Sequence, residues 1–145
     1  MNDCPRCAAL EAELARLRPP AWRPVAEVVV EVATVSEANA RDHHHTRAAR
    51  VRRQREAVTS KLESLHPEDR YHLAARRVRC TLTRLGAKSL DDDNLAGALK
   101  ACRDAVAAWL GCDDGPSGPV TWVYGQEAHK RWALRPGVRI TLEAA

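Results

Sequence analysis

Several common signatures are absent from this sequence of 145 residues. It has no run of 18 apolar residues, so no transmembrane helix is expected, and its start lacks the apolar core of a secretory signal peptide. It contains no glycine-rich phosphate-binding loop, no GxSxG motif and no Ser/His/Asp set typical of a hydrolase triad. These absences argue against membrane proteins, P-loop nucleotide-binding proteins and serine hydrolases, and they predict a cytoplasmic protein.

The cysteines do not form the pattern of a disulfide framework. They are odd in number and scattered, at Cys4, Cys7, Cys80, Cys102 and Cys112. This distribution agrees with a reducing compartment. Cys4 and Cys7 form a CxxC motif, but a closed zinc site needs four ligands and no second pair follows at zinc-finger spacing. A zinc site shared with a second copy, or with the histidines at 43–45, is the alternative to a leader with free thiols.

The chain divides into a short leader and one domain. Residues 8–18 predict a short helix, and Pro19, Pro20 and Pro24 separate it from the rest of the chain. We therefore predict a leader over residues 1–24, which is expected to be dispensable, and a single domain over residues 25–145. Apolar residues make up 45% of the chain, which is enough for one core.

The charge is unevenly distributed along the domain. The net charge is only +4, but residues 41–84 contain twelve Arg or Lys against five Asp or Glu. The acids gather instead in residues 91–114. A basic half beside an acidic cluster is typical of a protein that holds a polyanion by its phosphates.

Hydrophobic periodicity predicts an α+β fold in the order β-α-β-α-β-β, with helices packed on a small mixed sheet. Strands are predicted at residues 25–35, 73–85, 120–126 and 138–142, and helices at 46–65 and 95–110. The first half of the helix at 46–65 is crowded with arginines. A phosphate-binding role is predicted for Arg47, Arg50 and Arg53, together with Arg41 just before the helix.

The segment from Asp91 to Asp114 is the strongest functional signal. Asp91, Asp92 and Asp93 repel one another unless something positive lies among them, either a helix N-terminus or a divalent cation. In the helix that follows, Asp93, Gly97, Lys100 and Asp104 share the polar face, and Gly97 leaves room for a backbone or phosphate to approach. One Asp is enough to cap a helix, and the further pair Asp113-Asp114 exceeds that need. Helix capping and a metal site therefore remain two interpretations of the residues alone.

The same residues carry a resemblance to a known family. The pattern Asp91-x-Asp93-Asn94, then Lys100, Asp104 four residues later and a distant Asp113-Asp114, resembles the RusA-type crossover-junction endodeoxyribonucleases. These are small, dimeric, magnesium-dependent resolvases found mostly in phages and prophages. The element order agrees with the family over roughly residues 25–142, whereas only residues 91–114 are specific.

The resemblance implies a function and a set of roles. It implies a homodimer that resolves four-way (Holliday) junctions in double-stranded DNA by paired nicks, with Mg²⁺ as cofactor and Mn²⁺ as substitute. Asp91, Asp93 and Asp114 match the catalytic acids that hold the metal ion, with Asp113 as the substitute for Asp114. Lys100 matches the essential lysine, and Asn94 and Asp104 match supporting positions.

Two departures from the family pattern stand beside the resemblance. Lys100 lies six residues after Asn94 rather than three, which moves it by close to one helical turn. The family's basic residue after the Asp-Asp pair is replaced by Tyr124-Gly125-Gln126. The alternative hypothesis is a non-catalytic DNA-binding or phage regulatory protein on the same fold, whose acids only cap a helix and order a loop.

Overall fold

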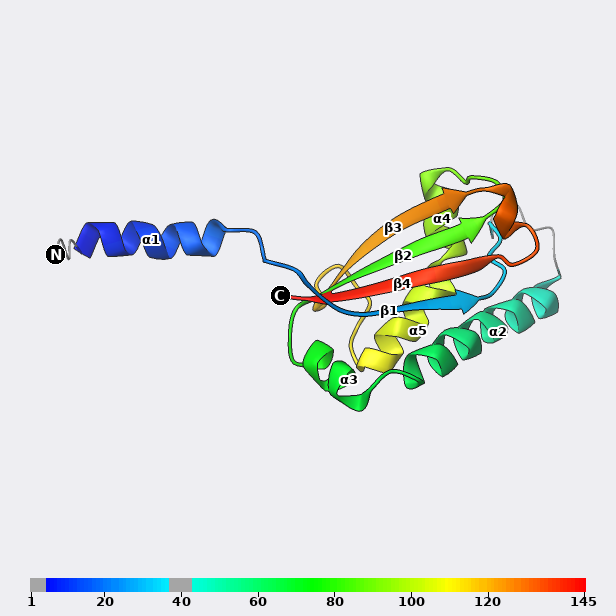
Figure 1. The fold of residues 1–145 in the computed structure, drawn as a ribbon, viewed down its shortest axis with the longest axis horizontal. Helices are drawn as coiled ribbons and strands as arrows, with labels where there is room; N and C mark the ends of the chain where they lie inside the picture. Colours follow the sequence, from blue (N-terminus) through cyan, green and yellow to red (C-terminus); the bar gives the residue numbers. More distant parts are fainter. Residues whose placement is uncertain (1–4, 37–42) are drawn as a thin grey trace.

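The computed structural model describes residues 5–36 and 43–145, and it has an α+β fold. The helices and strands occur in chain order as α1 (Pro5–Leu17), β1 (Arg23–Glu31), α2 (His44–Glu63), α3 (Pro67–Ala74), β2 (Val78–Gly86), α4 (Asp92–Ala98), α5 (Lys100–Leu110), β3 (Val120–Ala128), the 3₁₀-helix η1 (Lys130–Trp132) and β4 (Gly137–Ala144). The small mixed sheet and its helices agree with the predicted fold class (Figure 1). In the described part of the chain, no helix is long and apolar enough to cross a membrane.

The four strands form one sheet in the order β1-β4-β2-β3. Strands β2 and β3 are parallel, and α4 and α5 make the connection that parallel strands require. The other two pairs, β1 with β4 and β2 with β4, are antiparallel. Residues paired across the sheet point to the same face, so Val28, Ile140, Leu82 and Tyr124 stand in one row.

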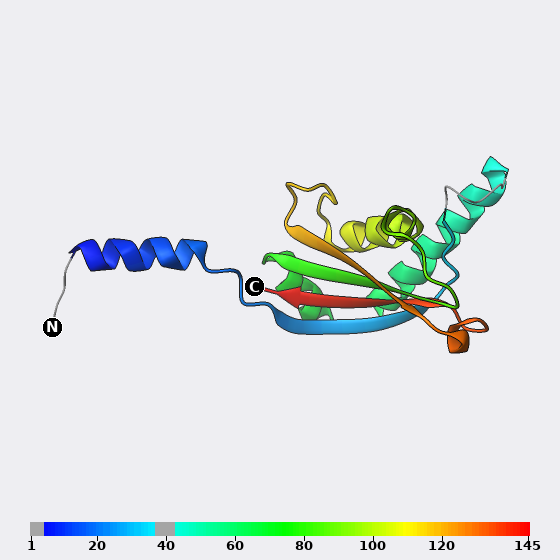
Figure 2. The same cartoon turned by 90° about the horizontal axis from the view of Figure 1, so that it is seen from above.

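One face of the sheet packs under α2 and α5, and the core lies between these layers (Figure 2). Leu62 of α2 and Val106 of α5 are fully buried, as are Leu82 of β2 and Ile140 of β4. The opposite face bears polar residues in ion pairs, such as Arg79 with Glu143 at 2.5 Å. No described helix covers that face in Figure 2.

The second predicted strand begins too early, because residues 67–74 form helix α3. His66-Pro67 follows the end of α2 and also starts a new helix. The His66 side chain accepts a hydrogen bond from the Glu68 backbone N–H at 3.3 Å, and Pro67 occupies the first helical turn. Leu73 is fully buried as part of this helix, and strand β2 begins only at Val78.

The single helix predicted at residues 95–110 is divided into α4 and α5. The division lies at Leu99, whose φ of −96° and ψ of −1° depart from helical values. Gly97 lies two residues before it and weakens the helix by about 1 kcal/mol relative to alanine. Gly111 ends α5 with a φ of +73°, a left-handed conformation that glycine adopts readily.

The core predicts where substitutions are costly. Leu62→Ala removes a fully buried side chain between α2 and the sheet, so we expect it to lower the free energy of unfolding by about 2–5 kcal/mol. Leu134→Ala is the matched control, because Leu134 is 94% exposed and its loss should change stability by no more than about 0.5 kcal/mol. Urea unfolding of both variants measures the difference, and equal effects would contradict the assigned core.

Candidate functional site

Asp91 caps helix α4 and fixes the acidic turn at its start. Its backbone is extended, and its Oδ1 accepts a hydrogen bond from the Asn94 backbone N–H at 2.9 Å. Its Oδ2 accepts a second one from the Asn94 side-chain amide at 2.9 Å. The cap satisfies a helix-terminal N–H that otherwise lacks a partner within the helix. Asp91 and the predicted supporting residue Asn94 therefore act as one unit.

Two residues from other parts of the fold hold this turn in place. The Gln126 amide of β3 binds both polar groups of the Leu90 backbone, accepting from its N–H at 2.9 Å and donating to its C=O at 2.7 Å. The Ser36 hydroxyl, beyond the end of β1, donates to the Asn94 side-chain oxygen. The turn before α4 is thus attached to two segments that lie far from it in sequence.

The other two acids of the turn face solvent. Asp92 and Asp93 lie in the first turn of α4, where the helix dipole favours negative charge. Both residues are exposed, and within residues 5–36 and 43–145 their carboxylates have no hydrogen-bond or ion-pair partner. The turn therefore presents two uncompensated carboxylates on a backbone that is firmly held.

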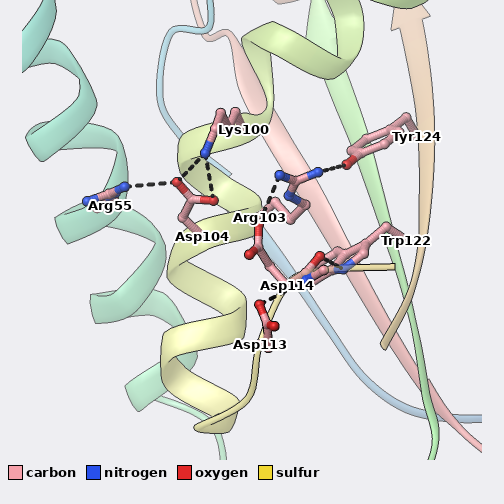
Figure 3. Close-up of polar contacts among 9 residues, drawn as sticks. Arg55, Lys100, Arg103, Asp104, Asp113, Asp114, Trp122 and Tyr124 are labelled. Atoms are coloured by element: carbon pink, nitrogen blue, oxygen red, sulfur yellow. Dashed lines mark hydrogen bonds and ion pairs between the residues drawn. The ribbon is translucent and has the colours of Figure 1, made fainter. Parts of the chain in front are cut away.

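The second acidic pair lies beside α5 and has protein partners (Figure 3). Asp114 forms an ion pair with Arg103 at 2.9 Å, and Arg103 also donates to the Tyr124 hydroxyl at 3.1 Å. The Asp114 backbone carbonyl accepts from the Trp122 indole N–H at 3.1 Å. Asp113 instead accepts from the Gly115 backbone N–H at 3.1 Å, which orders its own loop.

Asp104 lies between two cationic side chains. Its carboxylate accepts from Lys100 at 3.0 and 3.2 Å, one turn earlier on α5, and from Arg55 of α2 at 2.8 Å (Figure 3). The Asp104 side chain is only 18% exposed, whereas those of Lys100 and Arg55 are 62% and 52% exposed. Asp104 thus holds two cations that keep donors available to solvent.

These cations line a hollow of about 190 Å³ between α2 and the α4–α5 segment. Its lining includes Arg47, Arg55, Gly97, Lys100 and Asp104. A Cβ added at Gly97 would meet no atom within 4 Å, so the glycine leaves open space there, as the sequence predicts. Three of its lining side chains, Arg47, Arg55 and Lys100, are basic, against one acid, Asp104.

The predicted DNA-binding arginines lie at the start of α2, with one exception. Arg47, Arg50 and Arg53 are on this helix, and Arg47 reaches the hollow. Arg41 lies outside the described residues. Arg55 belongs to the same arginine-rich part of α2, and the structure shows that it donates to Asp104 at 2.8 Å. Only the docking of α2 on α5 reveals this contact, because 49 positions separate the two residues.

The four predicted metal ligands are not gathered at one point. In the described ranges, no group of three His, Cys, Asp or Glu side chains is placed to hold a metal ion. Asp91 and Asp93 are at the start of α4, Asp114 pairs with Arg103, and Asp113 turns to its own loop. Carboxylate oxygens suit a hard cation such as Mg²⁺. The donor chemistry therefore fits the predicted ion, whereas the side-chain arrangement does not by itself form a closed site.

Known proteins give no assignment for this chain. No protein-family model matches it, and neither a curated protein nor a solved structure matches it. Its function must therefore be argued from its own residues.

The Asp104 cluster predicts a pH-dependent stability. Burial works against the charged carboxylate, but the hydrogen bonds from Lys100 and Arg55 outweigh it and hold the pKa of Asp104 below its ordinary value. Because the pKa is lower in the folded state, this stabilisation is present above the unfolded pKa and is lost as the pH falls through the folded value. Asp104→Asn should therefore have a lower free energy of unfolding than the parent at pH 7. The difference between the two free energies should become smaller towards pH 2.

Urea unfolding at several pH values measures this difference in the free energy of unfolding. Lys100→Gln is the matched control, because it removes one donor and leaves Arg55 in place, so its effect on the pH profile should be smaller. A difference for Asp104→Asn that stays constant from pH 7 to pH 2 would contradict the role given to this carboxylate.

The Gln126 contact predicts a local effect on the acidic turn. Gln126→Ala leaves the partly buried N–H and C=O of Leu90 without their partner, at a cost of about 1–3 kcal/mol. The amide of Leu90 should then exchange faster with solvent, as hydrogen exchange measured by NMR can report. Thr121→Ala, at an exposed position of the same strand, should leave that amide unchanged.

Proposed function

We propose that this protein is a metal-dependent endonuclease of the RusA type, which resolves four-way DNA junctions. The observation that carries the proposal is the acidic turn before α4. Gln126 holds the backbone of Leu90 and Ser36 holds the side chain of Asn94, while the carboxylates of Asp92 and Asp93 face solvent without a partner in the described structure. A helix cap needs only Asp91, so the cap does not explain a firmly held turn with two further exposed acids.

The cations near this turn support a phosphodiester substrate. The Ala33–Ser36 region links the hollow beside α2 to the acidic turn before α4. Gln54 of α2 donates to the Ala33 carbonyl at 2.9 Å, and Ser36 donates to Asn94. The hollow lined by Arg55 and Lys100 is therefore tied to the acidic turn through the same short segment. Acids and exposed cations attached to one segment would suit a backbone phosphate whose charge grows during hydrolysis.

Each residue has a defined role in the proposed reaction. Bound Mg²⁺ would lower the pKa of water and neutralise charge on the phosphate oxygens. Asp91 and Asp93 would hold this ion, and Asp114 or Asp113 would complete the set after turning from its present partner. Lys100 and Arg55 would contact the scissile phosphate, and Asp104 would orient both of these cations.

The proposal also includes a homodimer and a branched DNA substrate. Cleavage of a four-way junction at two symmetric points is most simply done by a homodimer. The substrate would be branched double-stranded DNA in the cytoplasm, met during recombination or repair in a phage or prophage. The arginines of α2 would bind its backbone, so binding should weaken as the salt concentration rises.

A second candidate function is a non-catalytic DNA-binding protein. The hydrogen bonds of Asp91 and Asp113 favour it, because both acids already serve local structure. The ion pair between Asp114 and Arg103 also favours it, since it already neutralises that carboxylate. This candidate requires no metal ion, and it keeps the role of the basic helix α2.

Asparagine substitutions at neighbouring acids distinguish the two candidates. Asp93→Asn should reduce Mg²⁺-dependent cleavage of a synthetic four-way junction at least about a hundredfold, because it removes a charged ligand for the metal ion. Junction binding in EDTA should be unchanged or tighter, because a negative charge near the DNA is lost. Asp92→Asn removes the same charge one residue earlier, at the position that the family pattern leaves open, and should cut at nearly the parental rate.

Two results would contradict the nuclease. Full activity of Asp93→Asn would remove the metal-binding role of this residue. Absence of cleavage by the parental chain with either Mg²⁺ or Mn²⁺, together with salt-dependent junction binding, would instead identify the non-catalytic DNA-binding protein.

A further inference from the structure

Helix α1 exposes an apolar seam that its own domain does not cover. None of its residues is buried, and the helix leads away from the domain in both views (Figures 1 and 2). Leu10, Leu14 and Leu17 are 57%, 64% and 74% exposed. An isolated helix of 13 residues is marginal in water. A partner that covers these leucines would therefore stabilise α1.

The seam has the spacing of a coiled coil. Cys7, Leu10, Leu14 and Leu17 follow one another at steps of three, four and three residues. These are the a and d positions of two heptads, with Cys7 and Leu14 at a and Leu10 and Leu17 at d. Two helices with this spacing can bury their seams against each other. Because any helix with this spacing could pair with the seam, the flanking charges are needed to choose the partner.

The charges beside the seam identify the partner as a second copy. Arg6 and Glu13 occupy g positions and Glu11 an e position, and Arg18, the first residue after the end of α1 at Leu17, falls at the next e position. In a parallel pair of helices, each g residue faces the e residue of the next heptad on the partner. Arg6 then faces Glu11, and Glu13 faces Arg18, so every such contact joins opposite charges. An antiparallel pair would bring Glu11 against Glu11 and Glu13 against Glu13.

We propose that α1 is a dimerisation helix, which pairs in parallel and in register with α1 of a second copy of this chain. The linker agrees with this arrangement. Pro19 and Pro20 stiffen it, and the Arg79 guanidinium lies 5.2 Å from the centre of the Trp22 ring, which attaches the end of the linker to the sheet. The two helices would join side by side while each domain remains accessible.

The full-length chain tests the proposal by sedimentation equilibrium over a range of concentrations. Because the seam has only two heptads, we expect a dimer whose population depends on concentration. Leu14→Glu places a charge in the seam and should make the chain monomeric at every concentration. Ala12→Glu is the matched control, because position 12 lies at f on the outer side of the helix, and the dimer should persist.

A charge exchange tests the identity and orientation of the partner. Glu13→Lys places a positive charge against Arg18 of the second copy, so the dissociation constant should rise on the order of tenfold. Adding Arg18→Glu restores opposite charges and should return the constant to within about threefold of the parental value. A rescue of this kind requires that positions 13 and 18 face each other across the pair.

Cys7 gives an independent measure of the register. Cys80 and Cys102 are buried free thiols, and burial raises the pKa of Cys102 to about 12, so neither should react readily. With Cys4 and Cys112 replaced by serine, mild oxidation should link Cys7 to Cys7 of the second copy. Leu14→Glu in this background should prevent the link.

Four results would overturn the proposal. A chain that is monomeric at every concentration has no such interface, and a dimer that Leu14→Glu leaves intact must form through the domain instead. A Leu14-dependent dimer that does not cross-link at Cys7 would exclude the parallel register. A monomer destabilised by Leu14→Glu would assign the seam to the hollow between α2, α3 and α5 of its own chain, which measures about 480 Å³. A chain that is monomeric at every concentration would also contradict the proposed homodimer. The other results do not bear on DNA cleavage, which has its own test.

Discussion

The burial of one face of the sheet under α2 and α5 is the constraint on which the rest of the structure depends. Leu82 and Ile140 on the sheet meet Leu62 and Val106 on the helices, and all four side chains are removed from water. This apolar contact provides the main free energy of folding. It also brings α2 against α5, which places Arg55 beside Asp104. The polar cluster therefore exists only because the apolar layers beneath it are packed.

The acids of the domain fall into two classes, and the difference between them bears on function. Those beside α5 are neutralised within the protein, Asp104 by Lys100 and Arg55 and Asp114 by Arg103. Asp92 and Asp93, at the start of α4, have no cationic side-chain partner among the described residues, and they face solvent. A cation would be attracted to the second class, whereas a ligand from the first class would have to exchange one positive partner for another. The proposed nuclease would require Asp114 to exchange Arg103 for a metal ion, whereas the DNA-binding alternative would not.

Much of the fold follows from local patterns, and the differences have local causes. The four strands and the helix at 46–65 were predictable because alternation and a three-to-four-residue period are visible over short windows. Helix α3 was missed because His66-Pro67 both ends one helix and starts another, and sequence alone suggested only the ending. The division at Leu99 was missed because apolar periodicity continues across it, although Gly97 marks a weak point in the helix. Where one signal has two structural meanings, packing decides between them.

The sequence by itself determined the α+β class of the fold and the gathering of acids in one segment and of arginines in another. These properties depend on residues within one or two turns of each other, and a linear pattern records them fully. The tertiary structure alone decided that Gln126 holds Leu90, that Asp104 faces Arg55 of α2, and that Asp114 pairs with Arg103 rather than with the acids before α4. The physical reason is that a carboxylate or an amide takes whichever partner the docked elements bring within hydrogen-bond distance. That choice depends on strand register and helix docking, which no local stretch of the chain specifies.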